Sequence, residues 1–239
     1  MGADVAQRRA ARSSDLFRHP TSAVVCGPSR PFLNWIAYAL VSETPSWFFW
    51  TDVRSPGQGP DETGPLAKGM IPAERLHVLL PSELARSELP PDLNIRSVLK
   101  PDGARISTQD LTTFLRLPQH TQKIVSLIPA DAERVVIVLT NAQRMVALYP
   151  TETVGGFVRA IVKAGASFLV TFSDAPGEKR LAFDYIFHLK GEDPRKWEQA
   201  TLFVERGKAS GVFHTGSELH LSDIPAVSSV LRRELGPSR

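Results

Sequence analysis

The stretch SAVVCGPSRPFLNWIAYALVSE, residues 22–43, decides the fold expected of this chain. It begins with the apolar run at residues 22–26, which has the length and composition of a buried β-strand. The turn-rich segment GPSRP follows, and residues 33–43 then carry apolar side chains at helical spacing. The order strand, loop, helix predicts an α/β protein, because helical crossovers join parallel strands.

The same alternation continues along the chain. Further buried strands are predicted at residues 47–53, 75–80, 135–140, 167–172 and 184–189, and further helices at residues 108–117, 121–128 and 151–164. Short strands at residues 201–205, 211–214 and 218–221 then indicate an antiparallel extension, and Ser222 or Asp223 is expected to cap a last helix that ends near Glu234. We therefore predict a three-layer α/β sandwich with a mostly parallel sheet and a C-terminal antiparallel hairpin.

Length and composition predict one soluble domain. The chain has 239 residues, of which 42% are hydrophobic and 22% charged, with a net charge of +3. Residues 1–18 are polar and are expected to form a flexible tail, so residues 19–239 would form the domain. The sequence has neither an apolar run of membrane-spanning length nor a secretory leader pattern, and its one cysteine cannot form an internal disulfide. These features favour the cytoplasm.

The loop after the first strand is where an open α/β sheet holds its ligand. A working phosphate loop has the pattern GxxxxGK[ST], in which the lysine reaches the outer phosphates and the hydroxyl holds magnesium. Counted from Gly27, the last three positions are occupied by Phe32, Leu33 and Asn34. Because Phe32 is bulky and Leu33 is uncharged, this loop is expected to lack the means of neutralising a triphosphate. Arg30 offers a cation from a different position.

The order of elements resembles the RecA/KaiC-type branch of the P-loop ATPases over about residues 16–221. An aromatic second strand that ends in an acidic residue, the VVIVLT strand, and the DYIFHL strand running into TLFVERGKASG carry the resemblance. The family's second strand ends in catalytic carboxylates, which Asp52 alone matches. The acidic residue on the magnesium side is matched by the neutral Thr140 or Asn141.

The resemblance also implies a site shared between subunits. In the family, a basic pair reaches the nucleotide of a neighbouring subunit, and this pair would fall near Arg206 and Lys208. The departures at residues 32–34 and 141 argue against ordinary ATP hydrolysis, because phosphoryl transfer depends on positioning and on charge neutralisation by lysine and magnesium.

Three classes of function stay open at this point. The first is a non-catalytic regulatory or protein-interaction module without a cofactor, acting on a protein partner or on further copies of itself. The second is an atypical ATP-binding protein or slow ATPase that uses Arg30, Asp52 and Arg206, and the third is a nucleic-acid-binding adaptor. No catalytic residue or metal ligand is predicted; the candidate ligand-binding residues are Gly27, Ser29, Arg30, Asn34, Asp52, Asn141, Arg206 and Lys208.

Several conspicuous residues have structural interpretations that we favour. Cys26 and the aromatic run at residues 47–50 lie inside predicted strands and are expected to belong to the core. Asp184 precedes a predicted strand and is expected to act in a turn, and Asn141 is expected to cap a helix.

Overall fold

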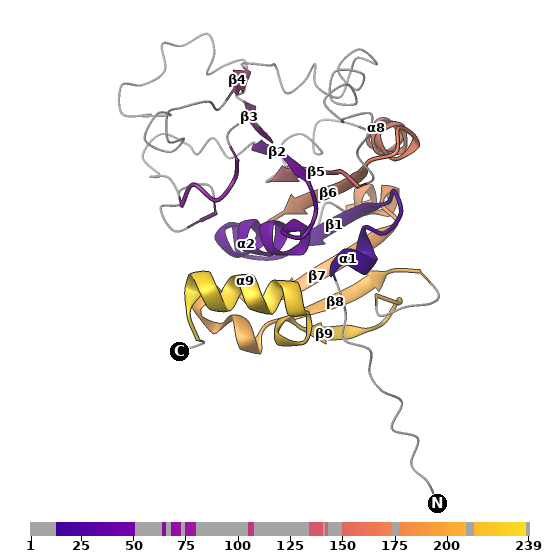
Figure 1. Cartoon of the computed structure of the whole chain (residues 1–239). Helices are drawn as coiled ribbons and strands as arrows, with labels where there is room; N and C mark the ends of the chain where they lie inside the picture. The colour runs from indigo at the N-terminus through magenta and orange to yellow at the C-terminus, as the bar shows by residue number, and fades with distance from the viewer. Residues whose placement is uncertain are drawn as a thin grey trace, which may run out of the picture.

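A computed structural model describes residues 13–50, 64–65, 68–72, 75–79, 105–107, 134–140, 142, 150–173, 177–208 and 213–237. Within these residues nine strands form one sheet, in the order β4-β3-β2-β5-β6-β1-β7-β8-β9 (Figure 1). Every pair from β4 to β7 is parallel, whereas the pairs β7–β8 and β8–β9 are antiparallel. The predicted mostly parallel sheet with an antiparallel C-terminal end is confirmed.

The strands and helices have the following bounds. The strands are β1 (Ser22–Cys26), β2 (Ser46–Trp50), β3 (Leu76–Leu79), β4 (Arg105–Ser107), β5 (Val136–Thr140), β6 (Ser167–Phe172), β7 (Tyr185–Lys190), β8 (Thr201–Arg206) and β9 (Glu218–His220). The α-helices are α1 (Ser13–Leu16), α2 (Arg30–Val41), α8 (Thr151–Lys163) and α9 (Pro225–Leu235), and the 3-10 helices are η2 (Gly177–Ala182), η3 (Pro194–Gln199) and η4 (Leu221–Asp223).

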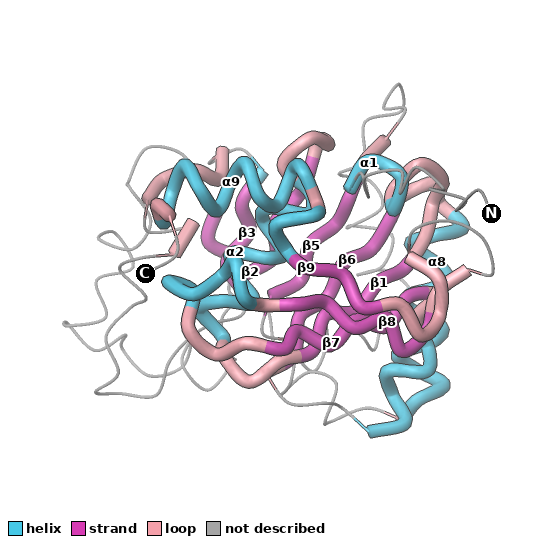
Figure 2. The backbone as a smooth tube through the Cα atoms, turned by 90° about the horizontal axis from the view of Figure 1, so that it is seen from below, coloured by secondary structure: helices cyan, strands magenta, loops and turns pink. Residues whose placement is uncertain are grey.

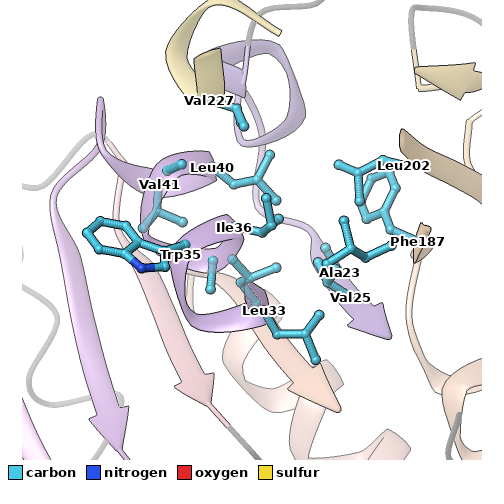
Figure 3. Packing of buried hydrophobic residues seen from close by; sticks show 14 of the residues in the cluster. Ala23, Val25, Leu33, Trp35, Ile36, Leu40, Val41, Phe187, Leu202 and Val227 are labelled. Atoms are coloured by element: carbon cyan, nitrogen blue, oxygen red, sulfur yellow. The ribbon is translucent and has the colours of Figure 1, made fainter. Parts of the chain in front are cut away.

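Helices cover both faces of the sheet, which makes the predicted sandwich. Helices α2 and α9 pack together on one face, and α8 lies on the other (Figures 1 and 2). The side chains of strand β1 alternate between two apolar clusters, one on each face of the sheet. Both faces must therefore be covered to keep these side chains from water. Ala23 and Val25 face α2, where they lie near Leu33 and Ile36 (Figure 3). None of the described helices is long and apolar enough to cross a bilayer.

The side chain of Cys26 faces the cluster on the α8 side and is buried. Burial raises the pKa of this thiol to about 12, against an opposing effect of the nearby Arg180. A thiol that stays protonated and shielded from water is inert. The expectation that Cys26 belongs to the core is confirmed.

Several predicted boundaries are wrong. Helix α2 begins at Arg30 rather than at residue 33, because the restricted φ angle of Pro31 suits the first turn of a helix. The predicted flexible tail is wrong for residues 13–18, since Leu16 and Phe17 are buried in the core. The predicted cap of the last helix is also wrong, because Ile224 is the N-cap and offers no side-chain hydrogen bond.

The remaining differences concern short elements. Strand β4 was not predicted, and the described end of the predicted strand at residues 211–214, Phe213 and His214, is a turn. The predicted helices at residues 108–117 and 121–128 lie outside the described residues.

Candidate functional site

The carboxyl ends of β1 and β6 form the topological switch point of the sheet. These two strands are neighbours, but the chain leaves β1 toward β2 and leaves β6 toward β7, in opposite directions along the sheet. Ligands of open α/β sheets bind outside the carboxyl ends of the strands, at the point where the direction of the connections reverses. The predicted loop at residues 27–31 therefore lies where proteins with an open α/β sheet usually bind their ligands.

The loop packs closely against the sheet. The backbone N–H of Gly27 donates a hydrogen bond to the carbonyl of Phe172, at 3.1 Å, which continues the pairing of β1 with β6. A Cβ atom added at Gly27 would lie 3.0 Å from the Cβ of Leu189 on β7. Glycine is needed here because the chain passes so close to its neighbour, not because it wraps a phosphate.

The residues that the sequence analysis compared with the glycine and lysine of a phosphate loop belong to the hydrophobic core. Phe32 and Leu33 are both fully buried in the cluster beneath α2. The ring of Phe32 reaches toward the end of β7, where it would lie 3.4 Å from a Cβ atom added at Gly191. These side chains occupy the interior instead of facing the switch point.

Arg30 brings a positive charge to the switch point. It is the first residue of α2 and is exposed, and its Nε donates a hydrogen bond of 3.4 Å to Oγ of Ser173, just after β6. Ser29 is the N-cap of α2, and its carbonyl accepts a hydrogen bond from the N–H of Leu33 at 2.9 Å. The partial positive charge of the helix N-terminus adds to that of the guanidinium.

Neutral polar side chains lie beneath this edge. Asn34 follows Arg30 by one helical turn on the same side of α2 and is buried. Thr140 at the end of β5 and Thr171 on β6 are fully buried and lie side by side, as the pairing of Leu139 with Val170 requires. Proteins usually bind magnesium through one or two carboxylates together with phosphate oxygens and waters. The buried part of the edge that is described supplies amide and hydroxyl groups only.

The basic pair of the predicted site lies elsewhere. Arg206 pairs with Ile186 in the first half of β7, whereas the end of β1 is level with His188. The ammonium of Lys208 lies 5.9 Å from the ring centroid of Tyr185, the first residue of β7. Both basic residues are thus toward the opposite edge of the sheet from the switch point, and a single chain does not join them to Arg30 in one site.

Arg206 is engaged within its own chain. Its Nη1 donates hydrogen bonds to the carbonyls of Leu181, at 2.7 Å, and of Phe183, at 3.3 Å. It therefore holds the connection between β6 and β7. The remaining candidates, Asp52 and Asn141, lie outside the described residues.

A charged cluster that the sequence analysis missed joins η2 to strands β7 and β8. Nε of Arg180 donates to both carboxylate oxygens of Glu205, each at 3.0 Å, and Nε2 of His188 lies 2.5 Å from Oε2 of the same carboxylate. The alternation of side chains along β8 could have indicated where Glu205 points. Leu202 and Val204 belong to the core, so Glu205 must lie on the opposite face of the sheet. The pairing of β7 with β8 could not be deduced from that period.

The pKa of Glu205 predicts a pH dependence of stability. Partial burial raises the pKa, but the hydrogen bonds and charges of His188 and Arg180 outweigh burial and hold it below its ordinary value of 4.5. A lowered pKa in the folded state contributes stability that is complete above 4.5 and is lost as the pH falls through the folded-state value. We expect the Glu205→Gln variant to lose less stability than the wild type below pH 4.5 in urea unfolding, and equal pH slopes would contradict this assignment.

Asp184 has a structural role, but the expected role in a turn is wrong, because its carboxylate binds residues at the start of β1. Its Oδ2 accepts hydrogen bonds from the backbone N–H and the hydroxyl of Ser22, both at 2.9 Å, and from the hydroxyl of Thr21 at 3.2 Å. These bonds tie the start of β7 to the start of β1. In the parts of the chain that are described, no group of three His, Cys, Asp or Glu residues could hold a metal ion.

Comparisons with known proteins agree with the fold and do not extend to a function. No family model and no curated protein sequence matches the chain. A solved structure from a structural study of Pyrococcus horikoshii OT3 is similar, with a TM-score of 0.50 and 8% sequence identity. The match covers 86% of this chain and 97% of the other. At this identity the likeness shows a shared fold.

Proposed function

We propose that this protein is a non-catalytic regulatory or protein-interaction module built on a RecA/KaiC-like fold whose nucleotide site has been lost. The observation that carries the proposal is the complete burial of Phe32 and Leu33 at the positions where a phosphate loop needs glycine and lysine. The position of this loop at a topological switch point supports descent from a nucleotide-binding arrangement. The protein would act in the cytoplasm, since a single buried cysteine fits a reducing compartment.

The charges at the switch point argue against catalysis. Phosphoryl transfer is accelerated almost entirely by positioning and by neutralising the charge that develops on the phosphoryl oxygens. Arg30 and the N-terminus of α2 supply positive charge, but Pro31 removes one of the backbone N–H groups from that terminus. If the resemblance holds, Asn34 and either Thr140 or Asn141 would stand where the family holds its metal, and all three are neutral. The scaffold of a nucleotide site without these charges favours a function through contacts with other proteins.

Titration with nucleotides tests this proposal directly. We expect calorimetry with ATP and ADP, with and without magnesium, to give no saturable heat, and we expect no release of phosphate above that of a blank. Saturable binding of magnesium–ATP, or turnover that increases with protein concentration, would overturn the proposal.

An atypical ATP-binding protein is the second candidate, and the position of Arg30 favours it. The guanidinium lies at a helix N-terminus beside the switch point, where anions are stabilised. This candidate predicts binding that the Arg30→Ala variant loses and that the Arg18→Ala variant keeps. Arg18 is a matched control because it is also exposed but precedes β1, at the other end of that strand. Equal binding by both variants would exclude a site at Arg30.

A further inference from the structure

Strand β9, at the bottom of Figure 1, is an edge of the sheet, and none of the described strands pairs with its outer side. On its inner side Leu219 pairs with β8, and the backbones of Ser217 and Leu221 also bond to β8 or to the residue that precedes it. The backbone groups of successive residues in an antiparallel strand point alternately to its two sides. The N–H and C=O groups of Glu218 and His220 therefore point outward, away from β8.

We propose that β9 pairs in antiparallel fashion with β9 of a second copy of this chain, so that two sheets join into one across a two-fold axis at Leu219. The inference deepens the proposed function and rests on it, because it names the partner of a module that acts through protein contacts. An unpaired edge is a template for another strand. A two-fold axis perpendicular to the sheet makes two identical edges antiparallel, so each can complete the other.

The register follows from the residues whose backbone groups point outward. With Leu219 on the axis, Glu218 of each copy lies opposite His220 of the other, and each such pair exchanges both of its backbone hydrogen bonds. A register centred on Glu218 would place His220 opposite Gly216. One centred on His220 would place Glu218 opposite Ser222. Both of these partners lie outside β9, so the Leu219 register is the one that uses all the outward backbone groups of the strand.

The side chains of β9 suit the same register. Glu218 and His220 are exposed on one face of the sheet, where the carboxylate of one copy would accept a hydrogen bond from the imidazole of the other. Leu219 lies on the opposite face, packed against the core cluster but still partly exposed, and it would meet Leu219 of the second copy at the axis. The registers centred on Glu218 or His220 would instead place like side chains opposite each other.

The contacts of Glu218 within its own chain leave this pairing open. The hydroxyl of Thr201 and the ammonium of Lys190 both bond to Oε1, at 2.7 and 3.0 Å. These two bonds hold the pKa of Glu218 below its ordinary value, so the carboxylate is charged at neutral pH. Within the described residues Oε2 makes no hydrogen bond or ion pair, and it is the oxygen that His220 of the second copy would reach.

Proline at residue 220 tests the backbone contacts separately from the fold of the single chain. His220 has a φ of −65°, the angle that proline requires, and its N–H points away from β8, so His220→Pro should fold like the wild type. We expect a monomer–dimer equilibrium of the wild type in sedimentation velocity at up to about 100 µM, and dimerisation of His220→Pro weaker by about tenfold or more. The matched control His220→Ala loses the imidazole but keeps the N–H, and it should dimerise more tightly than His220→Pro.

Charge exchange between two variants tests the register. Glu218→Lys would face its own kind with two cationic pairs and His220→Glu with two anionic pairs, so each alone should dimerise about tenfold more weakly than the wild type. In an equimolar mixture the new ammonium of one chain lies opposite the new carboxylate of the other, and the second position keeps its native pair of Glu218 with His220. The mixture should therefore form heterodimers.

Circular dichroism reports whether each variant is folded, and the charge exchange does not depend on the proline variant. Three results would each overturn the inference: a wild type that is monomeric at about 100 µM, a folded His220→Pro variant that dimerises normally, or a mixture that remains monomeric. The nucleotide titrations are independent of these measurements. A monomer that binds no nucleotide would overturn the dimer alone, and a dimer that hydrolyses ATP would overturn the proposed function.

Discussion

The Leu33→Lys substitution, which introduces the lysine of a phosphate loop, is expected to destabilise the protein strongly instead of creating a nucleotide site. Leu33 is fully buried in the cluster formed by α2 and the sheet, and Cδ2 of its side chain would lie 3.3 Å from a Cβ atom added at Gly27. An unpaired ammonium in this position costs about 4 kcal/mol or more, and domains of this kind are stable by about 5–15 kcal/mol.

Urea unfolding followed by circular dichroism measures this loss. The matched control is Leu33→Met, which keeps an apolar side chain of similar volume and should cost less than about 1.5 kcal/mol. A folded Leu33→Lys variant with nearly wild-type stability would show that residue 33 can turn to the solvent at the switch point. Such a result would remove the main support for a lost phosphate site.

The Phe32→Ala substitution is expected to destabilise the protein by about 3–5 kcal/mol, the usual loss when a buried aromatic side chain leaves a cavity. Phe32 is fully buried and its ring reaches toward Gly191 after β7. The same unfolding experiment provides the value. Phe32→Leu, which refills most of the space, serves as its control and should lose clearly less.

The Phe32→Ala variant also tests the proposed loss of the phosphate site. If bulk at residue 32 were the only obstacle, the smaller side chain would allow nucleotide binding. We expect no binding, because Leu33 and Asn34 still provide neither the charge nor the hydroxyl. A loss of stability below about 1 kcal/mol would contradict the core position of this ring.

The buried strands were the most predictable part of the fold. The bounds of β6 agree with the prediction at residues 167–172, and β5 differs from its prediction by one residue. Both strands are apolar on both faces, so their own residues were enough to predict where they begin and end. The start of α2 was predicted three residues late, because the prolines of the loop suggested a turn although Pro31 fits the first helical turn.

The candidate site was predictable only in part. That residues 32–34 cannot serve a phosphate loop follows from their side chains alone. The local sequence around Arg206, by contrast, suggests an exposed turn, while its guanidinium holds the carbonyls of Leu181 and Phe183. The cluster around Glu205 combines residues from η2, β7 and β8. A local sequence pattern does not indicate which strands become neighbours in the sheet.

The sequence by itself determined the class of the fold and the absence of the phosphate-loop pattern at residues 27–34, because strand and helix periods and the identities of residues 32–34 are local properties. Tertiary structure decided which distant residues meet. It alone separated Arg206 and Lys208 from Arg30 and bound Glu205 to Arg180 and His188. The physical reason is that strand order and register arise from packing the whole sheet, where each strand's partners are chosen by contacts far apart in the chain.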